Sequence, residues 1–187
     1  MNQQDRAVTP VIAIILMVAV LFVLAAAISV SFFGVAEDIN EPAPNVADTK
    51  GEFEIEGDWR GTQIVQITHV AGDNIAVGQV EIAVQASGPD VDSEARLVNL
   101  PAESTTFDSE NLEDSDNLID DGNVNRNNII IDDDSNVWAA GDTITFRINT
   151  GEADFRDGED PEADKLEVTI IHTESNTILS ENTFTPS

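Results

Sequence analysis

Residues 8–33 read VTPVIAIILMVAVLFVLAAAISVSFF, and this stretch divides the chain into two unlike parts. No charged residue occurs between Arg6 and Glu37. At about 1.5 Å per residue, a helix over residues 8–33 would be roughly 40 Å long, against a membrane hydrocarbon core of about 30 Å. Its apolar residues run around the whole circumference, which disfavours an amphipathic surface helix. We therefore expect one long hydrophobic helix that lies in lipid or against copies of itself.

The ends of this helix are marked by residues that favour helix termini. Thr9 is an acceptable N-cap, Pro10 suits the first turn, and Gly34 provides a stop. The side chains expected to form the membrane or assembly surface are Pro10, Val11, Ile12, Ile15, Leu16, Val18, Leu21, Phe22, Leu24, Ile28 and Phe32. Arg6 precedes the stretch and several acids follow it, a charge asymmetry that predicts a single span with the remainder of the chain outside the cell.

A secretory signal peptide is the first alternative for this segment. The apolar core of such a signal is usually about 7–15 residues long and is followed by a cleavage site of small residues. Residues 25–27 are alanines and would serve as that site. Cleavage there would leave a mature chain that begins with the apolar residues 28–33, so a retained helix is the better interpretation.

The rest of the chain is strongly acidic. The protein has 187 residues, 36 Asp plus Glu, 8 Lys plus Arg, no cysteine and a formal net charge of −28, and all but one of the acids follow residue 36. This composition excludes a disulfide scaffold, a cysteine nucleophile, thiolate-bound zinc and a basic nucleic-acid-binding surface. Such a surface suits a salt-rich, halophilic setting, where the Debye length falls to about 3 Å at 1 M salt. Acidity that serves cation binding is the competing explanation.

Short runs that alternate apolar and polar residues predict a β-rich head. Residues 37–50 contain Pro42 and Pro44 and are expected to form a connector between the helix and a head over residues 51–187. The expected strands are Glu52–Trp59, Thr62–Val70, Ile75–Gln85, Arg96–Leu100, Asn128–Ile131, Thr143–Asn149, Leu166–Thr173 and Thr177–Phe184. Turn residues separate them, which favours an antiparallel sandwich. The predicted fold class is thus α+β, a long N-terminal helix followed by an antiparallel β-sandwich-like head.

The same alternation predicts which side chains form the core of the head. The expected core is Val65, Ile67, Val80, Ile82, Val84, Ile144, Phe146, Ile148, Val168 and Ile170, with Trp59 and Trp138 at buried or rim positions. Residues 104–127 are rich in Asp, Asn, Ser and Glu and are expected to form a long surface excursion.

Candidate ligand sites in the head are weak. Acidic runs that could offer oxygen ligands to calcium are Asp132–Asp134, Asp120–Asp121, Asp114–Asp116 and Asp157–Asp160. None has the spacing of an EF-hand loop, and such runs are expected from composition alone. His69 and His172 could form a minimal metal site. Each lies at the end of an expected strand, however, and a structural role there is the better explanation. No catalytic motif is present, so we expect no enzyme activity, no cofactor and no bound metal.

The N-terminus carries a family resemblance. The run Asp5-Arg6-Ala7-Val8-Thr9-Pro10-Val11-Ile12, continued by the apolar residues 14–20, resembles the N-terminal domain of archaeal type IV pilins, especially those of halophiles. In that family a prepilin peptidase removes a short leader. The resemblance implies that residues 1–7 are the leader, that Arg6 and Ala7 end it, and that Val8 begins the mature subunit. Residues 8–36 would then be the pilin helix.

The resemblance implies a structural function. Expected partners are the prepilin peptidase, membrane lipid before assembly, and other pilin subunits in a helical polymer, with no nucleic acid. The expected location is the cell membrane, with the head outside, and then an extracellular pilus that serves cell adhesion. Two alternatives stay open. The first is a single-span anchored binding domain that never polymerises, and the second is an anchored hydrolase, for which no organised site is evident.

Overall fold

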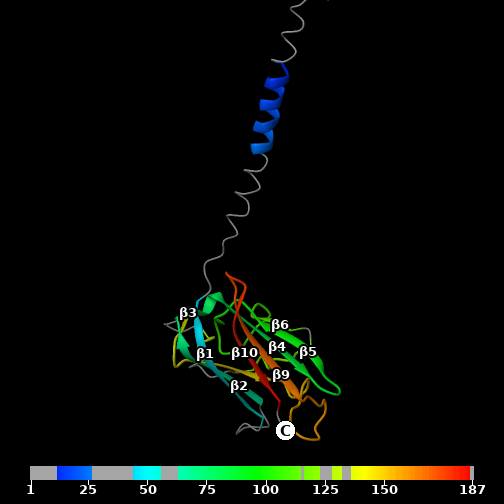
Figure 1. Ribbon diagram of the computed structural model, residues 1–187. Coiled ribbons are helices and arrows are strands. Elements are labelled where there is room, and N and C mark those ends of the chain that lie inside the picture. Colours follow the sequence, from blue (N-terminus) through cyan, green and yellow to red (C-terminus); the bar gives the residue numbers. More distant parts are fainter. Residues whose placement is uncertain are drawn as a thin grey trace, which may run out of the picture. The chain divides into compact units, whose positions relative to one another are not determined.

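A computed structural model describes residues 12–26, 44–55, 63–114, 116–122, 128–131 and 136–185 (Figure 1). The chain divides into two compact units, Met1–Glu41 and Pro42–Ser187. In the first unit, residues 12–26 form an α-helix. The ends of the expected longer helix, together with Trp59 and Asp132–Asp134, lie outside the described residues.

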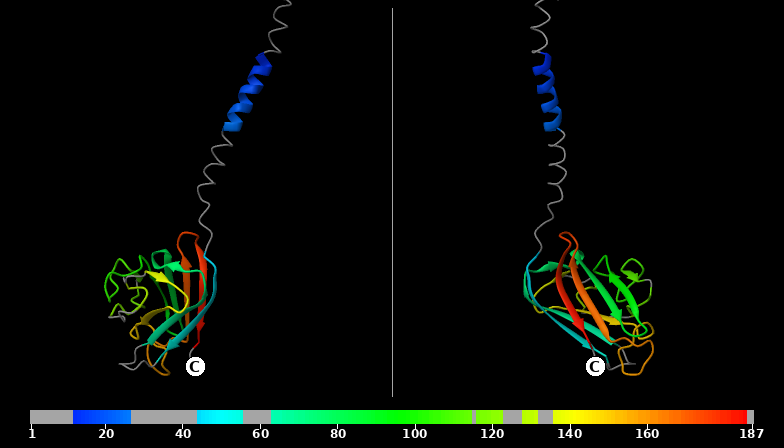
Figure 2. Two further views of the ribbon diagram at one scale, coloured as in Figure 1. Left: turned by 90° about the vertical axis from the view of Figure 1, so that its left-hand side faces the viewer. Right: turned by 45° about the vertical axis from the view of Figure 1, so that its right-hand side comes forward.

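The second unit is an antiparallel β head (Figures 1 and 2). One sheet has the order β1-β2-β8 and consists of β1 (Val46–Glu54), β2 (Gln63–Gly72) and β8 (Thr143–Ile148). A second sheet has the order β10-β9-β4-β5-β6 and consists of β10 (Thr177–Phe184), β9 (Lys165–His172), β4 (Val80–Ser87), β5 (Asp92–Leu97) and β6 (Leu112–Asp114). A small third sheet pairs β3 (Ile75–Ala76) with β7 (Val137–Trp138).

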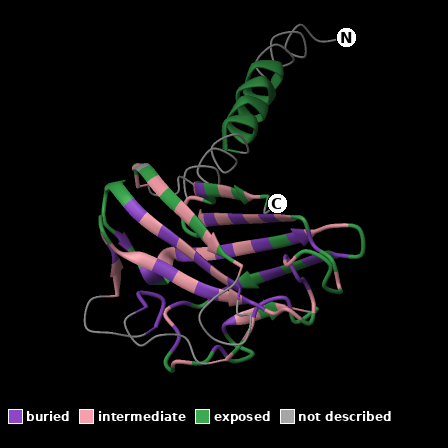
Figure 3. Cartoon of the chain, turned by 90° about the horizontal axis from the view of Figure 1, so that it is seen from below, coloured by how far each residue is buried: buried purple, intermediate pink, exposed green. Residues whose placement is uncertain are grey.

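The two larger sheets share one hydrophobic core, because each turns alternate side chains inward. Burial alternates with a period of two along β2, β4, β5, β8 and β9 (Figure 3). The expected core residues are all buried: Val65, Ile67, Val80, Ile82, Val84, Ile144, Phe146, Ile148, Val168 and Ile170. Trp138 is also fully buried. The antiparallel β-rich head is therefore confirmed, and the expected residues belong to a larger core that also includes Ile75, Leu97 and Ile130.

Several expected strands are correct and several need correction. Strands β2, β8, β9 and β10 lie where the alternation predicts them, within two residues at each end. β1 begins at Val46 rather than Glu52, so it takes up part of the expected connector. The expected strand Ile75–Gln85 is interrupted by a short 3-10 helix, Val77–Gln79, because β3 pairs with β7 whereas β4 joins the five-stranded sheet.

The remaining corrections come from long-range pairing. The strand expected at Arg96–Leu100 instead runs over Asp92–Leu97, where it pairs with β4 in a tight hairpin. The strand expected at Asn128–Ile131 is a turn that ends in an isolated bridge between Ile131 and Ala102. β6 and β7 were not expected, since two or three residues are too few to show periodicity.

The chain enters the head at Asn45, whose backbone N–H and carbonyl both form hydrogen bonds with Asp73. The backbone N–H of Asn45 donates to Asp73 Oδ2, and the Asp73 N–H donates to the Asn45 carbonyl, each at 3.0 Å. β1 then lies between β2 and the edge of the other sheet, where Thr49 Oγ1 and Ser180 Oγ are 2.6 Å apart. The ordered head thus begins before the first residue of β1.

The segment of residues 104–127, expected to be a surface excursion, is in part packed against the head. Leu118 and Ile119 are fully buried, and the backbone of this segment pairs with the outer edge of β8 through Asp120 N–H to Arg147 O, 3.0 Å. Further along this edge the buried Asn128 amide accepts from the Thr145 N–H at 3.0 Å and donates to the Thr145 carbonyl. These contacts cover an edge strand that would otherwise be open to pairing with another chain.

Gly88 allows a close backbone contact between the β4–β5 turn and the loop before β9. A Cβ at this position would lie 2.5 Å from Glu162 O and 2.7 Å from Ala163 Cα. We expect Gly88→Ala to lower the free energy of unfolding by about 2 kcal/mol, because backbone atoms must move to admit the methyl group.

Urea unfolding of the full-length chain in detergent micelles, followed by tryptophan fluorescence, measures this effect. Gly78→Ala is the matched control, since its Cβ would meet only Leu100 O at 3.6 Å. Equal unfolding midpoints for the two variants would show that the turn is not tightly packed.

Candidate assembly site

The helix of residues 12–26 is apolar and exposed on every side. Each of its residues is exposed, with Phe22 at 73% and Met17 at 67%. In the described part of the head, by contrast, the exposed large hydrophobic side chains are Val70 and Ile178. Burying one Leu, Ile, Val or Phe side chain is worth about 1.5–3 kcal/mol. Eleven of the thirteen exposed large hydrophobic side chains among the described residues therefore lie on this helix.

The described helix holds seven of the predicted site residues. They are Ile12, Ile15, Leu16, Val18, Leu21, Phe22 and Leu24, all exposed. The other predicted positions, Arg6, Ala7, Val8, Pro10, Val11, Ile28 and Phe32, lie outside the described residues. The prediction omitted Ile14, Met17, Val20 and Val23, which are exposed in the same way. The sequence already indicated these four residues, because the stretch is apolar around its whole circumference.

No helix in the described ranges is both long enough and apolar enough to cross a membrane.

The two histidines do not form a site with each other. His69 lies on β2 and His172 on β9, in different sheets. His69 Nδ1 lies 3.3 Å from the Trp138 carbonyl, whereas His172 Nδ1 lies 2.7 Å from Ser175 Oγ. Within the described ranges, no group of three or more histidines and carboxylates is placed to hold a metal ion.

Two of the acidic runs make structural contacts, through Asp114 and Asp120. The Asp114 carboxylate accepts from the N–H groups of Leu118 at 2.9 Å and Ile119 at 2.8 Å, so it shapes the turn after β6. Asp120 Oδ1 accepts from the Gly122 N–H at 2.7 Å, and Asp120 Oδ2 lies 3.2 Å from Arg147 Nη2. These carboxylates hold the chain that covers the edge of β8.

A buried ion pair fixes the loop between β8 and β9. Asp154 is 2% exposed, and its Oδ2 lies 2.5 Å from Arg156 Nη2. Burial alone would raise the pKa of Asp154, but hydrogen bonds from the Arg156 side chain and backbone, with the guanidinium charge, hold that pKa below its ordinary value of 3.8. The buried Gln63 amide joins the same loop, donating to Ala153 O and accepting from the Phe155 N–H, each at 2.9 Å.

The helix before the β head is apolar and exposed on every side. Such a helix needs lipid or another protein surface to shield it from water. A family comparison identifies that segment. Residues 6–47 match the family described as archaeal type IV pilin, N-terminal. The match includes the described helix and ends within β1, and it covers less than a quarter of the chain. No curated protein matches the chain.

Proposed function

We propose that this protein is a structural subunit of an archaeal type IV pilus and has no catalytic role. The observation that carries the proposal is the match of residues 6–47 to the pilin N-terminal domain, on a helix whose described residues are all exposed. The family supports assembly with other pilin subunits and a location at the cell surface. Adhesion is the role we assign to the assembled filament.

The proposed mechanism moves one helix between two water-free environments. Before assembly, the apolar segment lies in the membrane with the head outside. A prepilin peptidase then cuts between Ala7 and Val8, and the helix leaves the lipid to pack against equivalent helices in the filament core. A helix that is apolar all round suits both environments, because neither requires a polar face.

Open symmetry explains how such a filament grows. A head-to-tail contact between identical subunits that does not close into a ring repeats without limit. The heads would surround the helical core and face the medium. Their closed β8 edge supports this arrangement, because it limits sheet-to-sheet joining between heads.

The alternative is an anchored head that never polymerises. It shares the helix and the orientation, and it differs in two respects: the leader stays on the chain, and the protein stays in the membrane. The family match favours the pilin over this alternative.

The test is the N-terminal residue of the protein from intact cells and from the sheared extracellular fraction, read by mass spectrometry of the terminal peptide. We expect a start at Val8 in sheared material. A start at Met1, found only in membranes, would refute the pilin proposal and favour the anchored domain. A start near Ile28 would instead identify an ordinary secretory signal.

A further inference from the structure

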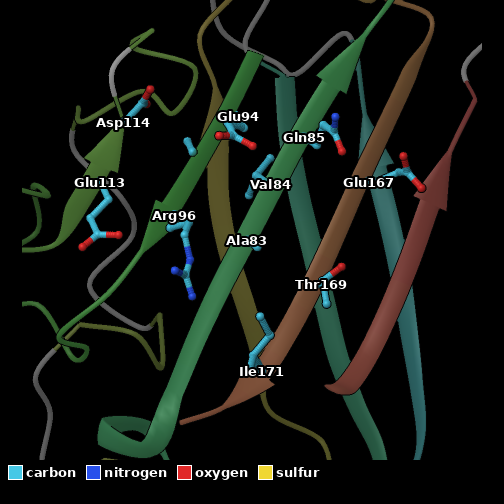
Figure 4. A pocket seen from close by; sticks show the side chains of 11 residues that line it. Ala83, Val84, Gln85, Glu94, Arg96, Glu113, Asp114, Glu167, Thr169 and Ile171 are labelled. Atoms are coloured by element: carbon cyan, nitrogen blue, oxygen red, sulfur yellow. The ribbon is translucent and has the colours of Figure 1, made fainter. Parts of the chain in front are cut away.

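The outer face of the five-stranded sheet is hollowed into an open groove of about 820 Å³ (Figure 4). Ala83 of β4 lies at its centre, in register with Thr169 of β9 on one side and Arg96 of β5 on the other. In the next cross-strand row, Gln85 lies between Glu94 and Glu167. Because Ala83 and Thr169 are short, the sheet is left open between longer polar side chains.

Some of the charged side chains that line this groove have ion-pair or hydrogen-bond partners, and others have no ion-pair partner among the described residues. Arg96 forms an ion pair with Glu81, and Lys165 Nζ lies 2.8 Å from Glu167 Oε2. The Asp114 carboxylate accepts from backbone N–H groups, as described above. Glu94 and Glu113 also line the groove, and neither has an ion-pair partner among the described residues.

The described part of the head has no spare cation for these two carboxylates. Its five basic side chains each form an ion pair: Lys50 with Glu52, Arg96 with Glu81, Arg147 with Asp120, Arg156 with Asp154, and Lys165 with Glu167. A positive group that pairs with Glu94 or Glu113 in this groove would therefore come from outside the described residues.

One end of the same face is apolar. Ile171 lines the groove, and its cross-strand partner Ile178 on β10 is 57% exposed. Ile178 is one of the two exposed large hydrophobic side chains in the described part of the head. The groove thus joins an apolar end to unpaired carboxylates, which is the pattern that complements an alkyl chain with a positive end.

We propose that this groove binds a lysine side chain presented by a partner protein, beside an apolar residue of that partner. The methylene groups of the lysine lie over Ala83 and Ile171, and its ammonium group donates to Glu94 and Glu113. Charge-assisted hydrogen bonds of this kind are the stronger ones in proteins. The proposal concerns the head and does not depend on processing or assembly of the N-terminal segment.

The experiment uses the ¹⁵N-labelled full-length chain in detergent micelles and the peptide acetyl-Leu-Lys-Leu-amide. We expect saturable NMR shifts of the amides of Gln85, Glu94 and Ile171. The same peptide with an acetylated lysine amine, which is neutral, is expected to bind at least about tenfold more weakly. The double variant Glu94→Gln with Glu113→Gln should weaken binding of the charged peptide by a similar factor.

The control variant removes the same charge elsewhere. Glu110 and Glu174 are exposed and do not line the groove, so Glu110→Gln with Glu174→Gln should leave the affinity unchanged. Equal weakening by both double variants would overturn the proposal, since binding would then follow net charge alone. Equal binding of the acetylated peptide, or no saturable shift, would overturn it as well. Filament formation is a separate readout, so failure here leaves the pilus proposal standing.

Discussion

Replacing Leu16 with Asp is expected to abolish the appearance of this protein in sheared extracellular filaments. Leu16 is 60% exposed in the N-terminal half of the described helix, where all the neighbouring side chains are apolar. A charged residue at the centre of a membrane helix costs about 2.5–3.5 kcal/mol for insertion, and an unpaired charge in a packed helical core is costly too. This single substitution is therefore expected to disfavour both the insertion of the helix into the membrane and its packing in the filament core.

Immunoblots of sheared and membrane fractions measure this effect. Leu16→Met is the matched control, because it keeps the apolar character and approximate volume of the side chain. We expect it to assemble as the unchanged protein does. Normal filaments from Leu16→Asp would show that this part of the helix is not buried in the assembled state, contrary to the proposed function.

Replacing Arg156 with Met is expected to lower the free energy of unfolding of the head by roughly 3 kcal/mol at neutral pH. The change leaves the Asp154 carboxylate buried without its guanidinium partner, and breaking a buried ion pair in this way typically costs about 3–5 kcal/mol. The lower end applies because the Arg156 side chain is 32% exposed. Methionine keeps most of the aliphatic stem, so the loss reports mainly the charge.

The pH dependence of this loss identifies its cause. The folded pKa of Asp154 lies below the ordinary value of 3.8, so the ion pair stabilises the fold fully above about pH 5 and progressively less as the pH falls through the folded pKa. We therefore expect the gap between the unchanged protein and Arg156→Met to narrow between pH 7 and pH 3. Urea unfolding at fixed ionic strength measures it, and a gap that is constant with pH would assign the loss to packing rather than charge.

The periodic parts of the fold could be predicted from sequence, whereas parts set by long-range contacts could not. Alternation along β2, β8 and β9 predicts both their limits and their buried faces, since each strand has one face in the core. β6 has three residues and is defined by its pairing with β5, so no local sequence pattern predicts this strand. Asn128 is polar and is absent from the predicted core, but it is buried because its amide bonds to Thr145 at the edge of β8.

The candidate assembly site was predictable because it depends on composition more than on tertiary contacts. A run without charge predicts the exposed apolar surface of residues 12–26 directly. The groove on the five-stranded sheet was not predictable in this way. Its residues lie on β4, β5, β6 and β9, and the ion pair of Arg96 with Glu81 joins side chains of two of these strands, so it exists only once they are paired.

The entry of the chain at Asn45 has a consequence for protein engineering. The pilin match runs to residue 47, but the head already begins at Asn45, which Asp73 fixes from both sides, and β1 begins at Val46. The family segment and the head therefore overlap along the chain instead of meeting at a free linker. A chimera that grafts this head onto another pilin helix should be joined before Pro44, because a junction at residue 47 would remove the first residues of the head.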